Sequence, residues 1–172
     1  MRYRMWLAVA CAAWLASPSL ARVVEDWPYE RLFKEADLVV IATAVSSKDT
    51  RDTFIDKRWP LDFVGQSTTF DVLQVVKGKY TEKKLDILHF KFGKRRDKET
   101  GPVLIRDGPT FVNFPTEPAE VKVGGVFFDK SKIEYMLFLK KAADGRYEPV
   151  SGRIDPDFSV RELFPPTFSR GE

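Results

Sequence analysis

The chain has 172 residues, of which 44% are hydrophobic and 13% aromatic, with 28 lysine and arginine residues against 25 aspartate and glutamate residues. This length corresponds to about one domain of about 150 residues, and the hydrophobic content is too high for a disordered chain. The single Cys and the single His exclude a disulfide-stapled scaffold and the common zinc and iron–sulfur ligand sets. We therefore predict one globular domain that needs neither a metal ion nor a cofactor.

The N-terminal segment has the three parts of a secretory signal peptide. Two arginines precede an apolar run over residues 5–15, and small side chains precede a cleavage site between Ala21 and Arg22. A membrane anchor would need about 20 unbroken apolar residues, and Pro18, with a serine on either side, keeps the apolar stretch shorter than that. We therefore predict export to the periplasm or the extracellular space, with residues 22–172 as a single mature domain that has no membrane span.

Signal cleavage changes the charge and the redox chemistry of the protein. Removing residues 1–21 leaves 151 residues with 26 basic and 25 acidic side chains, and Cys11 is lost with the signal. A Cys-free chain forms no disulfide and offers no thiol for catalysis. The nearly neutral balance predicts no nucleic-acid partner, because binding to a polyanion needs an excess of basic residues.

The first half of the mature chain is predicted to form one helix and three strands. Apolar side chains in residues 27–37 recur with a helical period, which predicts a short amphipathic helix. The β-branched run over residues 37–45 predicts a buried strand. Residues 67–76 and 84–92 are predicted as the next strands of a meander. Two consecutive valines at the end of the first of these strands indicate a bulge or a sharply coiled strand. Residues 47–66 show no period and are predicted as a long loop.

The next part of the chain is rich in turn residues. Residues 93–101 are polar and bounded by glycines, which predicts a loop tip. Short strands are predicted at residues 103–105 and 110–114. A further short strand at residues 126–128 is expected to pair locally with a neighbour.

The C-terminal part is predicted to hold a hairpin and a short helix. Residues 133–140 alternate between two apolar faces and predict a strand, which the Asp144-Gly145 turn connects to a returning segment over 147–154. Ser159 and Glu162 have the spacing of a capping box, which predicts a short helix.

These elements amount to five to seven strands with long connecting loops and a short helix near each end. We therefore predict a mainly β domain folded as a small β-barrel. A two-sheet β-sandwich uses the same strands and remains an alternative.

Three fragments resemble a large group of small exported bacterial proteins. They are ADLVVIATAV at 36–45, FDVLQVVKG at 70–78 and YMLFL at 135–139. The group is similar to the netrin-like or metalloproteinase-inhibitor-like branch of the OB-fold barrels, so the resemblance implies an OB-like barrel and leaves the function open. In the inhibitors of this fold an N-terminal Cys binds the protease zinc. The expected start at Arg22 departs from that pattern, and the resemblance does not extend to protease inhibition.

Two segments are candidate binding sites. Aromatic residues around Trp59 lie in a polar loop, where rigid rings either contact a partner at little entropic cost or fold back to cap a barrel end. The densest basic cluster follows Gly93 and is either a solvated hairpin tip or a contact for an anionic surface or glycan. The candidate ligand-binding residues are Arg58, Trp59, Phe63, Lys94, Arg95 and Arg96.

No set of catalytic residues is recognisable in the sequence. His89 lies in a predicted strand, and Asp86, three residues away, lies on the opposite face. We interpret His89 as a structural, hydrogen-bonded residue in the barrel wall. A G-x-S-x-G motif and a calcium-binding loop are both missing from the sequence. We predict no catalytic and no metal-binding residues.

Our leading hypothesis is an exported, non-enzymatic binding or scaffold module whose partner is another envelope or extracellular protein or a glycan. One alternative is a hydrolase of polysaccharide or peptide that uses a pair of carboxylates from among Asp37, Asp62, Asp71, Glu82 and Asp86. Another is a polyanion binder that uses residues 91–98. A shared site requires the loops around Trp59 and residues 93–101 to meet on one concave barrel end.

Overall fold

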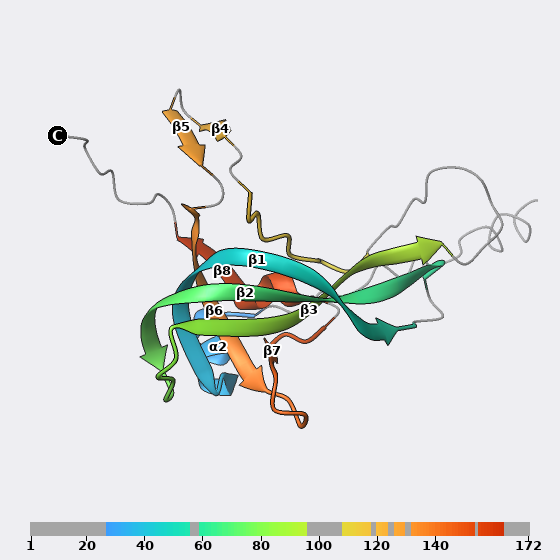
Figure 1. Cartoon of the computed structure of the whole chain (residues 1–172). Helices are drawn as coiled ribbons and strands as arrows, with labels where there is room; N and C mark the ends of the chain where they lie inside the picture. Colours follow the sequence, from blue (N-terminus) through green and yellow to red (C-terminus); the bar gives the residue numbers. More distant parts are fainter. Residues whose placement is uncertain are drawn as a thin grey trace, which may run out of the picture.

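The computed structural model describes seven segments of the chain. They are residues 27–55, 59–95, 108–117, 120–123, 126–129, 132–153 and 155–163. Most of these residues lie in β-strands (Figure 1). The elements are α2 (Tyr29–Glu35), β1 (Leu38–Phe54), β2 (Leu61–Lys77), β3 (Lys84–Arg95), β4 (Glu120–Val123), β5 (Val126–Asp129), β6 (Glu134–Lys141), β7 (Tyr147–Pro149), the 3-10 helix η2 (Pro156–Ser159) and β8 (Val160–Leu163).

Six strands of the described residues form one sheet, in the order β1-β2-β3-β7-β6-β8. β1 also pairs with β6, so that β1, β2, β3, β7 and β6 are joined in a ring. The pairings are antiparallel except between β3 and β7, which share one parallel residue pair, Ile87 with Tyr147. β4 and β5 pair separately from this sheet. The prediction of a mainly β domain is confirmed.

The two first strands are much longer than the sequence predicted. β1 continues to Phe54 and β2 begins at Leu61, so the prediction of a loop over residues 47–66 is wrong for most of that range. With β3 they form a three-stranded ribbon that extends beyond the ring (Figure 1). Much of this part of β1 is exposed on both faces, which removes the apolar alternation by which strands are recognised. A register shift between Asp49 and Thr53 adds a further irregularity.

The main core lies inside the ring. Alternate residues of β6, including Tyr135, Leu137 and Leu139, point into it, whereas Phe138 faces a second cluster. This confirms the two-faced strand predicted for residues 133–140. The buried residues of the ring core are Leu38, Val40, Ala42, Ala44, Phe70, Leu85, Ile87, Phe114, Ile133, Tyr135, Leu137, Leu139 and Val160.

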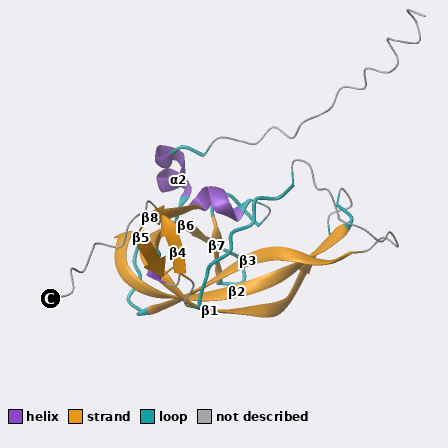
Figure 2. Cartoon of the chain, turned by 90° about the horizontal axis from the view of Figure 1, so that it is seen from above, coloured by secondary structure: helices purple, strands orange, loops and turns teal. Residues whose placement is uncertain are grey.

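The helix α2 covers the outer surface of β1 and β6. Leu32 and Ala36 are buried against Val39, Phe138 and Val150, and Figure 2 shows the helix outside the ring beside β6 and β8. α2 lies within the range predicted for a helix, residues 27–37. None of the helices in the described part of the chain has the length and the apolar run that a bilayer crossing requires.

A lysine on β2 closes the C-terminal end of α2. The Nζ atom of Lys77 donates hydrogen bonds to the carbonyl oxygens of Phe33, Lys34 and Ala36, at 2.5, 3.3 and 2.6 Å. Helix C-termini leave carbonyl groups without intrahelical partners, and a cation there also interacts favourably with the helix dipole. This contact joins α2 to the strand that lies 41 to 44 residues later in the chain.

Several local predictions are confirmed by the pairing. Val39 is opposite Lys77 and Val40 is opposite Val75, which leaves Val76 as the extra residue of the predicted bulge. β2 and β3 form the expected meander, and β5 pairs locally with β4. The turn at Gly145 connects β6 to the antiparallel β7.

The short C-terminal helix predicted from the capping box at Ser159 and Glu162 is wrong for the described residues that follow Ser159. Residues Val160–Leu163 form β8, which pairs with β6, and a 3-10 turn precedes them. The hydroxyl of Ser159 accepts a hydrogen bond from the backbone N–H of Ser151 at 2.7 Å instead of capping a helix. A capping-box pattern is local, and here a neighbouring loop and strand provide the competing partners.

The strand predicted at residues 110–114 is also not formed, because residues 108–117 have no regular secondary structure. β3 continues through Arg95 into the start of the predicted loop tip. The strand predicted at 103–105 and the signal peptide with its cleavage site at Ala21 and Arg22 lie outside the described residues.

Two glycines with similar backbone angles provide a matched stability test. Gly78 and Gly145 have φ angles of 89° and 87°, but a Cβ at Gly78 would lie 2.5 Å from the carbonyl oxygen of Asp37, whereas a Cβ at Gly145 would meet nothing within 4 Å. We expect Gly145→Ala to cost about 1 kcal/mol from backbone strain and Gly78→Ala to cost at least about 1 kcal/mol more. Urea unfolding measures both, and equal losses would contradict the close approach of Asp37.

Candidate functional site

The aromatic residues of the first candidate segment lie on the ribbon. Phe63 is only 2% exposed and packs with Leu88 and Phe90, and Trp59 is partly buried against the same cluster. Phe54 stacks on Phe63 with ring centroids 5.7 Å apart. Of the two alternatives that the sequence left open, this packing corresponds to a segment that folds back, here onto the ribbon and not over a barrel end.

The second candidate segment reaches the same end of the ribbon. Arg95 is paired with Leu61 in the β2–β3 ladder, and the preceding residue, Lys94, is exposed. Arg58 and Arg96 lie outside the described residues. The structure therefore brings the described parts of both segments to one end of the ribbon, where Phe63 is buried and the exposed Lys94 is available for contacts.

His89 is buried in the wall of the ring and is 1% exposed. Its Nε2 atom is hydrogen-bonded to the hydroxyl of Thr68 at 2.7 Å, and Thr68 is hydrogen-bonded to Ser47 at the surface, also at 2.7 Å. Burial, and then the positive charge of Lys91, lowers the pKa of His89 to about 4. Asp86 instead accepts a hydrogen bond from Thr69. The hydrogen-bonded position matches the structural interpretation of this histidine.

Asp62 and Asp86, two of the carboxylates considered for hydrolysis, are far apart. Asp62 and Thr69, the hydrogen-bond partner of Asp86, are both on β2 and are separated by seven residues, or about 23 Å. Two-carboxylate glycosidases need separations of roughly 5 to 9.5 Å. Among the described residues, no group of three or more His, Cys, Asp or Glu side chains is arranged to hold a metal ion.

A cleft that the sequence did not indicate lies between the β2–β3 loop and the β6–β7 turn. It has a volume of about 470 Å³. Its lining residues are Lys79, Tyr80, Thr81, Glu82, Lys84, Leu85, Asp86, Lys141, Gly145, Arg146 and Tyr147. The two loops are about 60 residues apart in the chain, so only the pairing of β7 with β3 and β6 brings them together.

Two tyrosines form the aromatic part of this cleft. The rings of Tyr80 and Tyr147 meet edge to face with centroids 5.9 Å apart, and both pack against the ring core. The Tyr80 hydroxyl donates a hydrogen bond to the carbonyl oxygen of Lys84 at 2.6 Å. Burial raises the pKa of Tyr80, so this hydroxyl is a neutral hydrogen-bonding group at physiological pH. Core packing and hydrogen bonding therefore fix the rings in place.

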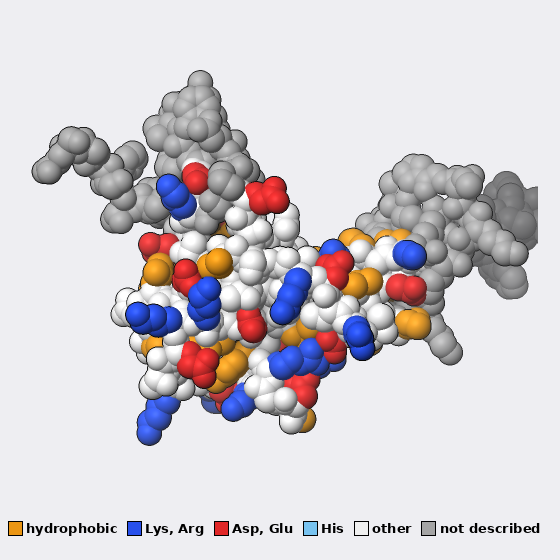
Figure 3. All heavy atoms as spheres, viewed as in Figure 1, with side chains coloured by type: hydrophobic (Ala, Val, Ile, Leu, Met, Phe, Trp, Pro, Cys, Tyr) orange, Lys and Arg blue, Asp and Glu red, His pale blue; other side chains and the backbone are white. Residues whose placement is uncertain are grey.

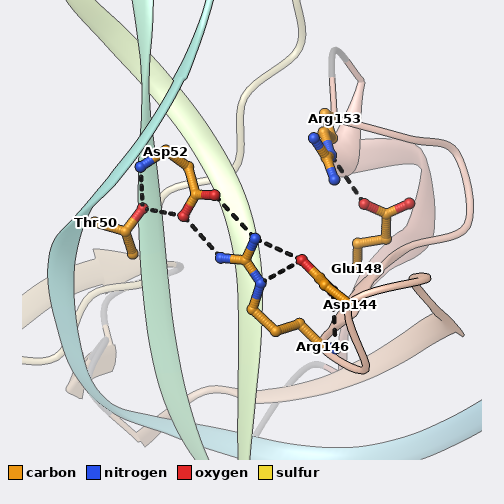
Figure 4. A network of polar contacts seen from close by, with 6 residues as sticks. All are labelled: Thr50, Asp52, Asp144, Arg146, Glu148 and Arg153. Atoms are coloured by element: carbon orange, nitrogen blue, oxygen red, sulfur yellow. Dashed lines mark hydrogen bonds and ion pairs between the residues drawn. The ribbon is translucent and has the colours of Figure 1, made fainter.

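Arg146 fixes the other wall of the cleft (Figure 4). Its Nη1 and Nη2 atoms form a bidentate pair with Asp52, at 2.7 and 2.9 Å, and its Nε donates to Asp144 at 2.8 Å. Thr50 donates a further hydrogen bond to Asp52 at 2.7 Å. The hydrogen bond from Arg146 is the main reason that the pKa of Asp52 is well below its usual range. The contact attaches the ribbon to the β6–β7 turn.

A glycine makes room for this contact. At Gly65, a Cβ would lie 2.5 Å from the Thr50 hydroxyl and 2.8 Å from the Cβ of Asp52. A side chain here would therefore displace the segment of β1 that presents Asp52 to Arg146. Asp52 carries no sequence signal, because its partner Arg146 is 94 residues away.

The cleft carries charges of both signs. Its lining includes three lysines and two carboxylates, namely Lys79, Lys84, Lys141, Glu82 and Asp86. The fourth cation of the lining is Arg146, whose guanidinium is already paired with Asp52 and Asp144. Figure 3 likewise shows basic and acidic side chains interspersed over the visible face, with no large area of one sign. Such a lining suits an uncharged polar ligand better than an anion, because no excess positive charge is offered.

Comparison of this chain with protein-family models, curated proteins and solved structures found no match.

Proposed function

We propose that this protein is an exported, non-enzymatic binding module with an OB-like barrel, and that it binds a glycan in the cleft between the β2–β3 loop and the β6–β7 turn. The observation that carries the proposal is this cleft itself. In it, two tyrosine rings fixed by packing are surrounded by basic side chains that donate hydrogen bonds and acidic side chains that accept them.

The strand order supports the OB-like part of the proposal. The OB-fold is a five-stranded, partly open Greek-key barrel. In this chain β7 inserts between β3 and β6, and β1 joins β6, so five strands close on themselves. The β6–β7 turn then connects the fourth and fifth strands of the ring, and the corresponding loop in OB-folds is among those that bind oligosaccharides.

The chemistry of the lining supports a glycan as the ligand. A sugar presents apolar C–H faces and many hydroxyl groups, which match aromatic rings and mixed hydrogen-bonding groups respectively. Tyrosine offers an apolar body with a polar tip, and Tyr80 and Tyr147 are held in place before binding. Lys79 and Glu82 lie on the exposed loop above them and provide a donor and an acceptor.

The predicted signal peptide supports export. We expect protein recovered from the periplasm or the medium to have the intact mass of a chain that begins at Arg22, because the signal peptidase removes residues 1–21 during export. Recovery of only the full-length chain from inside the cell would contradict this part of the proposal.

The binding test uses a panel of immobilised polysaccharides and titration calorimetry on any that retain the protein. We expect Tyr147→Leu, which keeps an apolar side chain against the core, to weaken glycan binding about tenfold because it removes one ring from the cleft. Phe33→Leu is the matched control, since Phe33 is an exposed aromatic residue on α2 outside the cleft.

Two results would contradict the proposal. One is that no polysaccharide retains the wild-type protein, and the other is that both leucine variants bind equally well. Release of shorter sugars from a retained polysaccharide would instead favour the hydrolase hypothesis, although Asp62 and Asp86 are too far apart to form its carboxylate pair.

A further inference from the structure

We propose that the outer edge of β3 is a docking groove for an extended segment of a partner protein that carries two aromatic side chains three residues apart. In this structure residues 108–117 of the chain itself occupy that groove. The inference concerns a second site, at the opposite end of β3 from the glycan cleft, and does not depend on that cleft.

Two aromatic contacts define how the resident segment lies. The ring of Phe111 meets that of Phe92 with centroids 4.8 Å apart, and the ring of Phe114 meets that of His89 at 5.2 Å. Moving three residues forward along the segment therefore corresponds to moving three residues back along β3. The segment runs antiparallel to β3, which is the direction of a strand added by β-augmentation.

The groove offers one aromatic socket on each face. Phe111 packs on the ribbon cluster, with its ring also 5.6 Å from that of Phe63. Phe114 enters the ring core, where it meets Phe70 and Tyr135 edge to face, at 4.8 and 5.1 Å, and is only 5% exposed. Side chains three residues apart in an extended chain point to opposite faces, which explains how one segment fills both sockets.

The resident segment is held mainly by these side chains. Among the described residues, no backbone hydrogen bond joins residues 111–114 to β3. The segment is anchored at Thr110, whose N–H and hydroxyl donate to Asp155 at 3.2 and 3.1 Å and whose carbonyl accepts from the N–H of Asp157 at 3.3 Å. A partner strand that also formed ladder hydrogen bonds would have an interaction that the resident lacks.

The edge itself has unused hydrogen-bonding groups. In the described structure, β7 pairs with β3 only at Ile87, so the outer edge of the later β3 residues has no strand partner. Beside Phe114, the Nδ1 atom of His89 and the hydroxyl of Tyr135 have no hydrogen-bond partner, although these residues are 1% and 2% exposed. The backbone edge of β3 beyond Ile87 is therefore where an added strand would form its ladder hydrogen bonds.

Space for a different backbone is present next to the resident segment. A pocket of about 480 Å³ lies between it and the ribbon. Its lining residues are Gln66, Lys91, Phe92, Pro109, Phe111, Val112 and Asn113. Lys91 is already paired with Asp49 at 2.6 Å, so the groove recognises aromatic groups and backbone more than charge.

The test uses a labelled synthetic peptide of residues 108–117, GPTFVNFPTE, with blocked ends, and measures fluorescence anisotropy. Thr110→Val removes the hydroxyl anchor at nearly constant shape, and Phe114→Ala empties the core socket. Because the resident segment then competes less well, we expect both variants to bind the peptide at least about tenfold more tightly than the wild type does. Thr53→Val, an exposed position on β1, is the matched control.

Two further measurements distinguish groove binding from general adhesion. The same peptide with both phenylalanines replaced by alanine should not bind, and backbone amides of β3 beyond Ile87 should exchange hydrogen more slowly when the peptide is bound. The proposal is overturned if folded Thr110→Val protein binds no more tightly than the wild type, or if the alanine peptide binds equally well. Thr110→Val decides the outcome if Phe114→Ala does not fold.

Discussion

Replacing Phe70 with alanine is expected to lower the free energy of unfolding by about 4 kcal/mol, as measured by urea denaturation. Phe70 is fully buried in the ring core, and its ring contacts those of Phe114 and Tyr135 edge to face. The substitution removes the transfer free energy of a large side chain and leaves a cavity that strands of a ring have little freedom to close. The aromatic contacts add a smaller loss.

The same strand provides the control for this prediction. Leu73 is 54% exposed, and Leu73→Ala is expected to change the free energy of unfolding by no more than about 0.5 kcal/mol. Similar losses for the two variants would show that the inward-facing and outward-facing residues of β2 have been assigned wrongly.

Protonation of His89 is expected to make the fold less stable in mild acid. The folded-state pKa is about 4, against an unfolded value of about 6.5, so the unfolded chain binds the proton more readily. The stability contributed by neutral His89 is fully present above about pH 6.5 and is lost as the pH falls toward 4. The difference of about 2.5 pKa units corresponds to about 3 kcal/mol.

Urea titrations between pH 7.5 and 4 measure this effect. In His89→Gln, where the amide retains a hydrogen-bonding group near Thr68, the decline over this range should disappear even if the variant is less stable throughout. Protonation of Asp52 does not contribute to this decline. Its carboxyl pKa is lowered in the folded protein, so stability is lost only when the pH falls below the pKa of about 4 that the group has in the unfolded chain. A wild-type curve that stays flat from pH 6.5 to 4 would mean that His89 is exposed to solvent.

The two proposed sites place separate demands on β3. Its first residues, including Lys84 and Asp86, line the cleft proposed to bind a glycan, whereas Phe92, near its other end, lines the pocket beside the resident segment. His89 lies between them in the ring wall. Because the sites use different residues of a strand that is fixed by its pairing with β2, each can be tested by substitution without removing the other.

The sequence determined much of the fold wherever one face of an element is buried. The alternation in residues 133–140 and the β-branched run at residues 37–45 predicted strands that the structure contains, because burial imposes a period on the side chains. The bulge at Val75-Val76 and the turn at Gly145 were also readable, since each depends on a few adjacent residues.

The sequence failed where the deciding partner lies far away in the chain. The polar part of β1 and β2 was predicted as a loop because a ribbon exposed on both faces has no apolar period, and its strands are specified by pairing. A strand forms in place of the short helix expected after the Ser159 cap, because β6 offers backbone hydrogen-bonding partners there. Local patterns cannot register such competition.

Both candidate sites depend on tertiary structure for the same reason. The sequence identified Trp59, Phe63 and Lys94 as noteworthy residues, but it could not show that Phe63 is buried in a cluster on the ribbon. Composition and spacing predicted a mainly β domain behind a signal peptide, and the mature chain expected after cleavage is nearly neutral and Cys-free. Only the closing of β1 onto β6 and the insertion of β7 next to β3 decided which loops form a cleft, because sites on a ring of strands are built from contacts across the chain.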